Sequence, residues 1–324
     1  MKKYPDNQKA SVLILTLFIV FFLSSIALSI SHATRIKTKI ISRHIQNQAA
    51  LKIAESAVFL ALAELKADKK DNNYDCFDDR WYEKFHNANK VKDFKFKNSV
   101  GEEIGEYRID IQDEAARMNI NTASSDLIEN LIYQVSKKDN SKTVQAIKEY
   151  RESLRPKKII RSVYELLKIK AMDKTIFWGE DTNANDFLDK GEDDQADSLP
   201  EDNGNGRLEY GVKDFFTVFT DGKINLNTAS EKILLSIPGM TEQGAKTIVN
   251  IRENQPFQDE KVLEAMPFLS KQANQFIIRW GTVNSDLFRV IVMARVNQAN
   301  NYKQIIAIAD RSYDPIKIIY WREN

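Results

Sequence analysis

A six-residue motif occurs almost twice in this chain, as Asn-Ile-Asn-Thr-Ala-Ser at 119–124 and as Asn-Leu-Asn-Thr-Ala-Ser at 225–230. Each copy precedes an apolar stretch with helical spacing. Each is followed later by an Arg-Glu pair, Arg151-Glu152 and Arg252-Glu253, which we interpret as a turn before a second short helix. Repeated units generally pack so that each buries the apolar face that the other leaves exposed. The repeat therefore predicts a domain of paired helical hairpins, a design best known from DNA-binding proteins.

The composition limits the function. With 324 residues the chain has room for about two domains and a sizeable core. Its 47 basic and 46 acidic residues give a formal net charge of +1, so it is not an overall polycation that would attract nucleic acid. Its single cysteine, Cys76, cannot form an internal disulfide, and we expect it to be a buried small side chain. Metalloprotease, nucleophile-elbow and P-loop motifs are absent, so we expect neither catalysis nor a small-molecule substrate.

The N-terminal region predicts one very long helix. Ser11 to Ile30 is a run of twenty residues without a charge, enough to cross a bilayer core of roughly 30 Å. A cleaved secretory signal is the alternative, but neither Gly nor Pro occurs from Asp6 to Val100. Apolar residues also continue at i, i+4 spacing, at Ile41, Ile45, Ala49, Ile53, Ala57, Ala61 and Leu65. We therefore expect a retained anchor, half in lipid and half with one apolar stripe for a partner.

Strand periodicity appears on both sides of the helical region. Residues 94–97 and 107–111 alternate apolar and charged side chains and are separated by Gly101 and Gly105, which predicts a β-hairpin. Residues 287–296, 302–310 and 316–321 predict three further strands. The region from Glu114 to about Trp280 has mostly helical spacing. The fold class expected is α+β, with a helical domain inserted in a small antiparallel sheet that packs on the N-terminal helix.

An acidic stretch between the repeats has the spacing of a calcium loop. Residues 180–202 contain ten carboxylates and one basic residue, Lys190. Oxygen-bearing side chains fall at positions 1, 3, 5, 9 and 12 of a twelve-residue loop, with a backbone carbonyl at position 7. Asp186 stands where an EF-hand has Gly. The predicted structural Ca²⁺ ligands are Asp181, Asn183, Asn185, Phe187, Asp189 and Glu192.

A second calcium loop could follow in either of two registers. One frame uses Asp193, Gln195, Asp197 and Glu201. The other uses Glu201, Asn203, Asn205, Gly206 and Glu209. The absence of thiolates and imidazoles from the whole stretch argues against zinc or copper.

Residues 234–248 resemble a helix-hairpin-helix motif with the turn Ile237-Pro238-Gly239. DNA-binding versions carry two glycines in this turn, so that backbone N–H groups can approach a phosphate. Here Thr241 stands at the second glycine position, and Glu242 would repel phosphate. The first repeat has lost Pro-Gly altogether. We therefore expect the hairpins to have a packing role, with no nucleic acid bound.

The chain resembles the minor pseudopilin K of bacterial type II secretion systems (the GspK family), nearly from end to end. The resemblance rests on residues 113–121 (Asp-Glu-Ala-Ala-Arg-Met-Asn-Ile-Asn), on the acidic loop closing at 191–194, and on residues 221–229 (Asp-Gly-Lys-Ile-Asn-Leu-Asn-Thr-Ala). It implies a pilin-like fold, calcium in the inserted domain, and a place at the tip of a short periplasmic pseudopilus with the I and J minor pseudopilins and the major pseudopilin. It also implies a single pass through the bacterial inner membrane, with the C-terminal domain in the periplasm.

The resemblance divides the chain into a prepilin leader (1–10), a transmembrane pilin helix (11–66), a connection with a β-hairpin (67–113), an inserted helical domain (114–281, calcium loops at 180–210) and C-terminal strands (282–324). Prepilin peptidase would cut, with methylation of the new N terminus, between Ala10 and Ser11. The family usually has Gly before the cut. Leu15 stands at the fifth mature position, where most pseudopilins have Glu and the K type does not. A tip subunit needs no such Glu, since nothing lies above it.

The sequence hypothesis is a non-enzymatic subunit that initiates and caps a secretion pseudopilus, by which folded proteins leave through the outer membrane. Two alternatives remain open: a membrane-tethered DNA receptor of the ComEA kind, and a minor pilin of a type IV pilus. The C-terminal strands and Thr241 argue against the receptor. Salt-dependent duplex binding by a soluble fragment, starting at about Lys66, would favour it.

Overall fold

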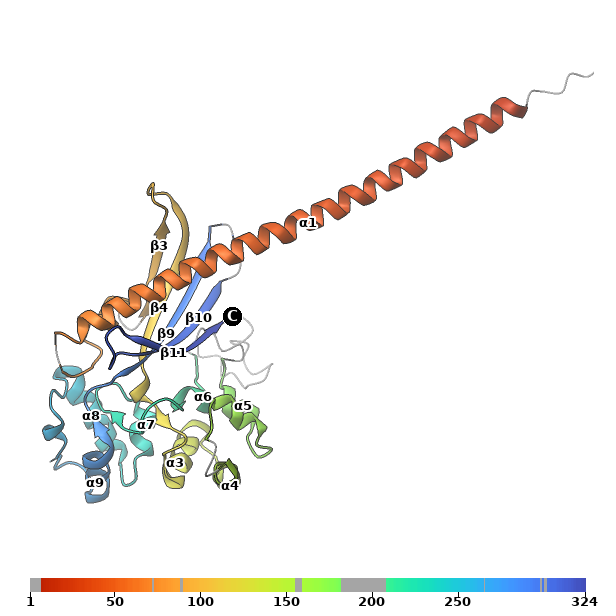
Figure 1. The fold of residues 1–324 in the computed structure, drawn as a ribbon. Coiled ribbons are helices and arrows are strands. Elements are labelled where there is room, and N and C mark those ends of the chain that lie inside the picture. Colours follow the sequence, from red (N-terminus) through yellow and green to blue (C-terminus); the bar gives the residue numbers. More distant parts are fainter. Residues whose placement is uncertain are drawn as a thin grey trace, which may run out of the picture.

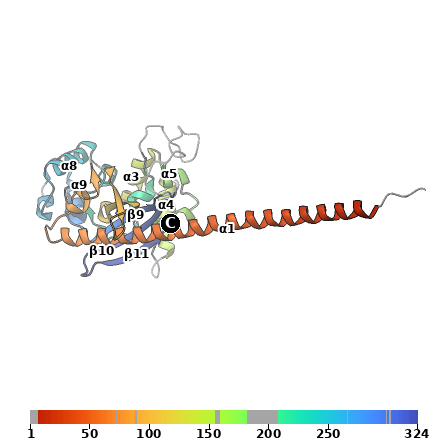
Figure 2. The same ribbon diagram turned by 90° about the horizontal axis from the view of Figure 1, so that it is seen from above.

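The computed structural model describes residues 7–71, 73–87, 90–154, 159–181, 208–264, 266–297, 299 and 302–324. Its dominant element is helix α1, Asn7–Asp68, of 62 residues. No Gly or Pro interrupts this segment, which allows the backbone hydrogen bonds to continue through seventeen turns or so at about 3.6 residues each. The helix projects far beyond the folded body (Figures 1 and 2). Side chains from Val12 to Ile45 are exposed, and burial begins at Ala50.

A five-stranded antiparallel sheet packs against the second half of α1. Its order is β11-β10-β9-β4-β3. The strands are β3 Asp93–Lys97, β4 Glu103–Asp113, β9 Leu287–Val296, β10 Lys303–Asp310 and β11 Lys317–Glu323. The expected hairpin and the three expected C-terminal strands are therefore present, and the α+β pilin-like fold class is confirmed.

The core between helix and sheet explains the two periodicities. Val292 pairs with Ile109 on one side and with Ile305 on the other, so every second residue of three neighbouring strands faces α1. Helix α1 contributes the apolar residues at i, i+4 spacing. Its second half packs on the chain's own sheet. The buried members of this core are Ile53, Ala54, Ala57, Val58, Ala61 and Leu65 of α1, with Trp81, Phe85, Ile109, Ile111, Phe288, Val290, Val292, Ala294, Ile305, Ala307 and Ala309.

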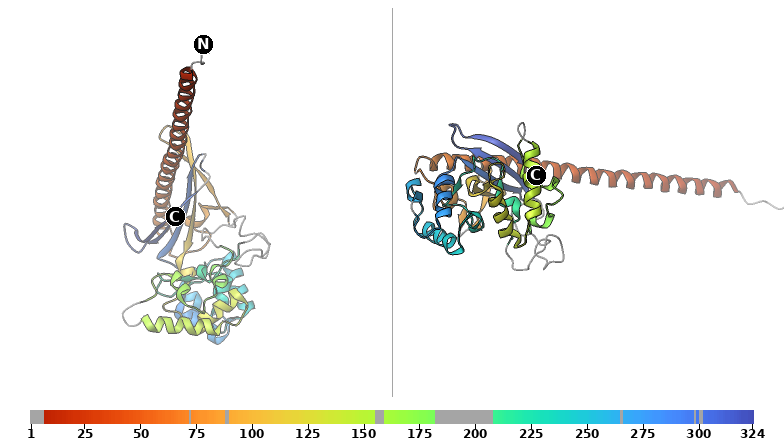
Figure 3. Two further views of the ribbon diagram at one scale, coloured as in Figure 1. Left: turned by 90° about the vertical axis from the view of Figure 1, so that its right-hand side faces the viewer. Right: turned by 90° about the horizontal axis from the view of Figure 1, so that it is seen from below.

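The helical domain is inserted between two strands that are neighbours in the sheet. The chain leaves at the end of β4 and returns at the start of β9, and these strands pair from Gly105 with Val296 to Asp113 with Phe288. Both ends of the insertion therefore lie side by side, so β4 and β9 can pair without any contribution from the inserted domain. The inserted elements cluster beyond this end of the sheet (Figures 1 and 3).

The inserted domain consists of two units with the same order of elements. Each begins with a short strand, continues through a helical hairpin, and ends with a short parallel partner strand. The elements of the domain and its approach are α2 Arg80–Glu83, β1 His86–Asn87, β2 Lys90–Val91, η1 Glu114–Ala116, β5 Met118–Asn119, α3 Ser125–Ser136, α4 Ser141–Leu154, η2 Val163–Lys168, α5 Lys174–Trp178, α6 Val212–Phe215, β6 Phe216–Thr217, β7 Ile224–Asn225, α7 Glu231–Ser236, α8 Glu242–Asn254, η3 Glu260–Glu264, α9 Lys271–Trp280 and β8 Gly281–Thr282. Strand β5 pairs with β6, and β7 pairs with β8.

The two units share one apolar core, in which α3 packs against α7. The interpretation of the Arg-Glu pairs as turns was wrong. Arg151 lies inside α4 and Arg252 inside α8, so each is part of the second helix of its hairpin. The error arose because local sequence does not show the bonding partners of these arginines. Each arginine donates to backbone carbonyls of the motif that begins its own unit.

Candidate functional site

The passage from the sheet into the inserted domain is built on Asp113 and Glu114, both buried. The Asp113 carboxylate accepts from Ala115 N at 2.7 Å, and its Oδ2 accepts from Thr228 Oγ1 at 2.6 Å and Asn225 Nδ2 at 2.8 Å. Burial raises the pKa of Asp113. Its neighbour Glu114 accepts from Thr217 Oγ1 and Arg289. These two side chains therefore join the end of β4 to both inserted units and to β9.

Burial by itself would raise the pKa of Glu114, but the charges of Arg289 and Arg117 hold this pKa below its usual value. Arg289 reaches the carboxylate through two nitrogens, Nη2 at 2.8 Å and Nε at 3.0 Å. A buried charge with such bidentate pairing keeps its ionised form. Glu114 is thus a fixed anion at the domain boundary.

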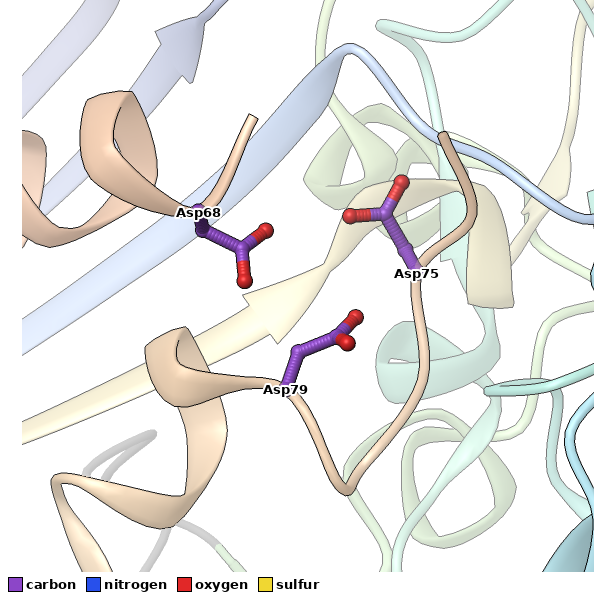
Figure 4. Close-up of side chains that lie close together, drawn as sticks. All are labelled: Asp68, Asp75 and Asp79. Carbon is purple, nitrogen blue, oxygen red and sulfur yellow. The ribbon is translucent and has the colours of Figure 1, made fainter. Parts of the chain in front are cut away.

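A second buried cluster lies where α1 ends, and sequence reasoning missed it. Asp68, Asp75 and Asp79 have carboxylate oxygens within 4.8 Å of one another, and Figure 4 shows all three facing a common space. Arg311, which follows β10, donates to Asp68 Oδ2 at 3.0 Å, to both oxygens of Asp75, and to Ser285 O at 3.0 Å. Arg311 is itself buried and lies over the Phe288 ring, 4.5 Å from its centroid.

The cluster carries more negative than positive charge. Burial, with the charge of Asp79, raises the pKa of Asp68 to about 6 in spite of Arg311. Burial raises the pKa of Asp75 to about 7, although Arg311 opposes this shift. Asp79 Oδ2 accepts from Cys76 N at 2.7 Å and Trp81 Nε1 at 3.3 Å. Because a guanidinium, backbone N–H groups and an indole already bond these oxygens, the cluster functions as a buried ionic junction that fastens α1 to the rest of the body.

The duplicated motif makes several matching hydrogen bonds in the two units. The first asparagine accepts from the backbone N–H two residues on, Asn119 from Asn121 and Asn225 from Asn227. The second asparagine bonds both backbone groups of a distant residue. Asn121 holds Ile160 N at 3.0 Å and Ile160 O at 2.9 Å. In the second unit Asn227 holds Phe257 N and O, each at 2.8 Å.

The other residues of the motif begin and fasten the hairpin helices. The final serine caps the first helix, with Ser124 Oγ accepting from Leu127 N and Ser230 Oγ from Ile233 N, both at 3.3 Å. The arginine of the second helix then donates to motif carbonyls. Arg151 bonds the carbonyls of Ala123 and Asn121, and Arg252 those of Leu226 and Ala229. The repeat is therefore explained by internal hydrogen bonding.

The hairpin turn between α7 and α8 is backed by protein. Gly239 has φ +77°, and a Cβ there would lie 2.7 Å from Ser270 Oγ. Ser270 Oγ donates to Gly239 O at 2.8 Å. Thr241, at the position where DNA-binding hairpins have a second glycine, caps α8 by accepting from Gly244 N at 3.0 Å. The exposed Glu242 follows in the first turn. This turn therefore presents a carboxylate where a phosphate would approach.

Most of the predicted calcium ligands lie outside the described residues: Asn183, Asn185, Phe187, Asp189, Glu192, Asp193, Asp197, Glu201, Asn203 and Asn205. The structure does describe the two ends. Gly179 and Tyr210 form an antiparallel bridge, and Glu180 Oε2 accepts from Glu209 N at 2.7 Å. These contacts therefore hold residues 181 and 208, which flank the acidic segment, on neighbouring stretches of chain.

Asp181, the predicted first calcium ligand, is fully buried. Its Oδ2 accepts from Lys213 Nζ at 2.9 Å, and the same ammonium donates to Asp214 Oδ1 at 2.7 Å. Burial opposes a charged Lys213, yet Asp214 and Asp181 raise its pKa above the usual range. Any cation that bound Asp181 would have to bind through the other carboxylate oxygen or share Oδ2 with this ammonium.

The remaining predicted positions lie on α1. Ala10 and Ser11 belong to its first turns, and the predicted membrane segment from Ser11 to Ile30 is helical throughout. Within the described ranges, α1 is the one helix long and apolar enough to cross a membrane, and its apolar stretch is not buried in the protein. This fits a single membrane anchor.

Comparison with known proteins supports the fold and the hairpin. A family model described as helix-hairpin-helix motif matches residues 220–277. Among solved structures, the chain is similar to one in the crystal structure of the GspK-GspI-GspJ complex from the enterotoxigenic Escherichia coli type 2 secretion system. The match has a TM-score of 0.53 and 15% identity, and it covers 86% of this chain and 96% of the other. No curated protein matches the sequence significantly. The expected resemblance to pseudopilin K is thus confirmed in the fold.

Proposed function

We propose that this chain is a minor pseudopilin of a type II secretion system. The observation that carries the proposal is the shared architecture, in which a long helix, an antiparallel sheet and a domain inserted between β4 and β9 match a chain of the GspK-GspI-GspJ complex over most of both chains. A binding or scaffolding role is the one that this fold supports, because the similar chain belongs to a complex of secretion-system proteins.

The tip of the pseudopilus is the position that best fits the chain. Pilin subunits stack through their N-terminal helices, and a buried charge in lipid needs a partner. Leu15 stands where a Glu would neutralise the N-terminal amine of a neighbouring subunit. The inserted domain adds a second body at one end of the sheet, which would block further stacking (Figure 3). Both features suit a capping subunit that helps to start assembly.

The proposed partners are the I and J minor pseudopilins and the major pseudopilin, with prepilin peptidase acting earlier in the inner membrane. Their docking surface would include the unpacked part of α1. Ile41 and Ile45 are 59% and 62% exposed, although they continue the same stripe that packs on the sheet further along. An apolar stripe of this kind on an isolated helix is typical of a helix–helix interface.

Co-purification tests this proposal. The full-length chain, expressed with the I-type and J-type pseudopilins of the same genome, should be retained with both, and its removal should stop export by that system. Ile41→Gln with Ile45→Gln should weaken retention. The matched control, Ile159→Gln with Ile278→Gln, changes two equally exposed isoleucines elsewhere and should leave retention unchanged. Failure of the parent chain to associate with either partner would contradict the proposal.

A DNA receptor is the second candidate, because the helix-hairpin-helix match at residues 220–277 favours it. The turn geometry argues against it, since Ser270 backs Gly239 and Glu242 follows the cap. Duplex binding by the full-length chain, measured at several salt concentrations, separates the two candidates. Tight binding that weakens steeply with salt would support the receptor.

We further propose that the acidic segment binds a structural calcium ion. The residues that would hold it are Asp181, Asn183, Asn185, the Phe187 carbonyl, Asp189 and Glu192. Hard oxygen donors suit Ca²⁺, which would neutralise clustered carboxylates that otherwise repel. Because the Lys213 ammonium already bonds Asp181 Oδ2, the ion would bind Asp181 through its other carboxylate oxygen.

A further inference from the structure

The stretch of α1 between its apolar segment and the folded body carries a concentrated positive charge. Arg35, Lys37, Lys39 and Arg43 fall within nine residues. No carboxylate occurs between Asp6 and Glu55. All four side chains are exposed, and no ion pair joins any of them to another described residue. The charge is therefore uncompensated within the part of the chain that the structure describes.

Three of these cations form a ridge on one side of the helix. Arg35, Lys39 and Arg43 are spaced at i, i+4 and i+8, which brings them onto one face. They line a shallow groove together with the hydroxyl-bearing Thr34, Thr38 and Ser42. The exposed isoleucines at 36, 40, 41 and 45 lie on the remaining circumference, so the cationic ridge and the apolar stripe can have different partners.

The position of the ridge along the helix identifies the partner. Arg35 follows Ile30 by five residues, a rise of about 7.5 Å, and the headgroup layer of a bilayer is roughly 5–7 Å deep on each side of the hydrocarbon core. Helical side chains lean toward the helix N terminus, which here is toward the membrane. Lys39 and Arg43 follow Ile30 by about 13.5 and 19.5 Å, so their charged ends lie outside the headgroup layer but within about one Debye length of it, where the negative surface potential still acts.

We propose that Arg35, Lys39 and Arg43 form a binding surface for anionic phospholipid headgroups, in the leaflet on the side of the folded body. The Arg35 guanidinium binds phosphate and glycerol oxygens, and all three cations are attracted to the negative membrane surface. This contact opposes withdrawal of the helix from the bilayer. The inference depends on α1 crossing a membrane and not on the proposed role in secretion, so either can fail without the other.

Spin-labelled lipids test the proposal with the full-length chain in phosphatidylcholine bilayers. The fraction of label immobilised by the protein should be several-fold higher for phosphatidylglycerol than for phosphatidylcholine, and the preference should fall at high salt. Arg35→Gln, Lys39→Gln and Arg43→Gln together should remove most of it. Any remaining preference should come from Lys37 and from Lys2, Lys3 and Lys9, which precede the apolar segment in the sequence, and should disappear when these are also changed to Gln.

The matched control removes three exposed lysines from the inserted domain, Lys142→Gln, Lys148→Gln and Lys271→Gln, and should retain the full preference. Arg35→Lys with Arg43→Lys should also retain the lipid preference, because attraction to headgroups depends on positive charge and not on the planar geometry of the guanidinium group. Equal lipid preference in the ridge variant and the parent would overturn the proposal. It would also be overturned by duplex DNA binding that depends on the three ridge residues while lipid preference does not.

Discussion

At the scale of single residues, the body depends on a few buried charges with fixed partners. Arg311 is the central one, because it is the cation that bonds Asp68 and Asp75 and also holds Ser285 O. It lies more than two hundred residues from either carboxylate in the chain. Removing one member of such a network leaves opposite charges buried without compensation, which is costly even where the intact network is nearly neutral in energy.

Arg311→Met is therefore expected to lower the free energy of unfolding by about 3–5 kcal/mol near pH 8. Urea denaturation followed by circular dichroism measures this loss. The control is Arg80→Met, since Arg80 is about half exposed in its pairs with Glu64 and Asp71 and, as a surface ion pair screened by water, should contribute little. A loss for Arg311→Met no larger than that of the control would show that the buried junction is not a main stabilising contact.

The same junction predicts a pH dependence. Asp75 has a folded pKa of about 7, against an ordinary value of 3.8, so the folded chain holds this proton more tightly than the unfolded chain. Its contribution to stability therefore increases as pH falls from 8 through 7 toward 4, and is lost as pH rises through 7. The slope is at most about 1.4 kcal/mol per pH unit for each proton bound.

Asp75→Asn should flatten this dependence between pH 8 and pH 5, while Asp286→Asn, at a largely exposed carboxylate, should leave it as in the parent. Thermal unfolding at several pH values provides the measurement. Identical slopes for Asp75→Asn and the parent would mean that Asp75 does not titrate in this window.

At the scale of elements, the two hairpin units show why one short motif was used twice. Each unit needs an asparagine to satisfy backbone groups of its distal loop, a serine to cap its first helix and an arginine to hold the opening turn. These contacts are internal, so the stability of each unit is enough to account for the repeated motif. The units differ in exposure, because Asn227 is fully buried and Asn121 is half-buried.

Asn227→Ala should be more damaging than Asn121→Ala. The first change leaves Phe257 N and O buried without partners, at about 1–3 kcal/mol for each unsatisfied group. In the second change, the lost Asn121 side chain is itself only half-buried, so water can enter the space that it leaves and bond the released groups of the buried Ile160. Melting temperatures of the two variants provide the comparison. The reverse order would mean that the two motifs do not hold their units by the same bonds.

The acidic segment carries its own prediction at this scale. Asp181→Ala with Glu192→Ala should lower the melting temperature relative to the parent when calcium is present, and much less when a chelator replaces it. Asp181→Ala alone also releases Lys213 from one of its two carboxylates, so Glu192→Ala alone separates the metal effect from that contact. Equal melting of the parent with calcium and with chelator would exclude a structural calcium ion.

At the scale of the whole molecule, the two halves of α1 have different roles. Its first part is exposed from Val12 to Ile45, and its second part forms one wall of the sheet core. A soluble fragment starting near Lys66 would therefore lose Ile53, Ala57 and Ala61 and uncover the sheet face that they bury. The boundary that matters for folding lies near residue 46, well before the end of the helix.

A chain that starts at Gln46 should accordingly remain folded, with a melting temperature within a few degrees of the full-length protein. A chain that starts at Lys66 should unfold or aggregate, because burial of each of the lost larger side chains contributes about 1.5–3 kcal/mol. Circular dichroism melting and size-exclusion chromatography measure both outcomes. Stable folding of the shorter fragment would show that the sheet does not need this wall.

The sequence by itself determined what depends on neighbouring residues. The absence of Gly and Pro and the apolar i, i+4 spacing predicted α1, and alternation predicted β3, β4, β9, β10 and β11, because helical and extended backbones place side chains with periods that can be read locally. The repeated motif likewise predicted two related hairpins. The glycine turn of the second hairpin was likewise predicted from local sequence.

Only the tertiary structure decided which distant groups meet. Asp68, Asp75 and Asp79 looked like parts of a polar connection, and nothing in their spacing pointed to Arg311. The arginines of the repeats were taken for turn residues because their bonds to the opening motif span more than twenty positions. The spacing that predicted Asp181 as a metal ligand gave no sign of its buried ion pair with Lys213. In each case the partner is chosen by packing of elements, which brings together charges that are far apart in the chain.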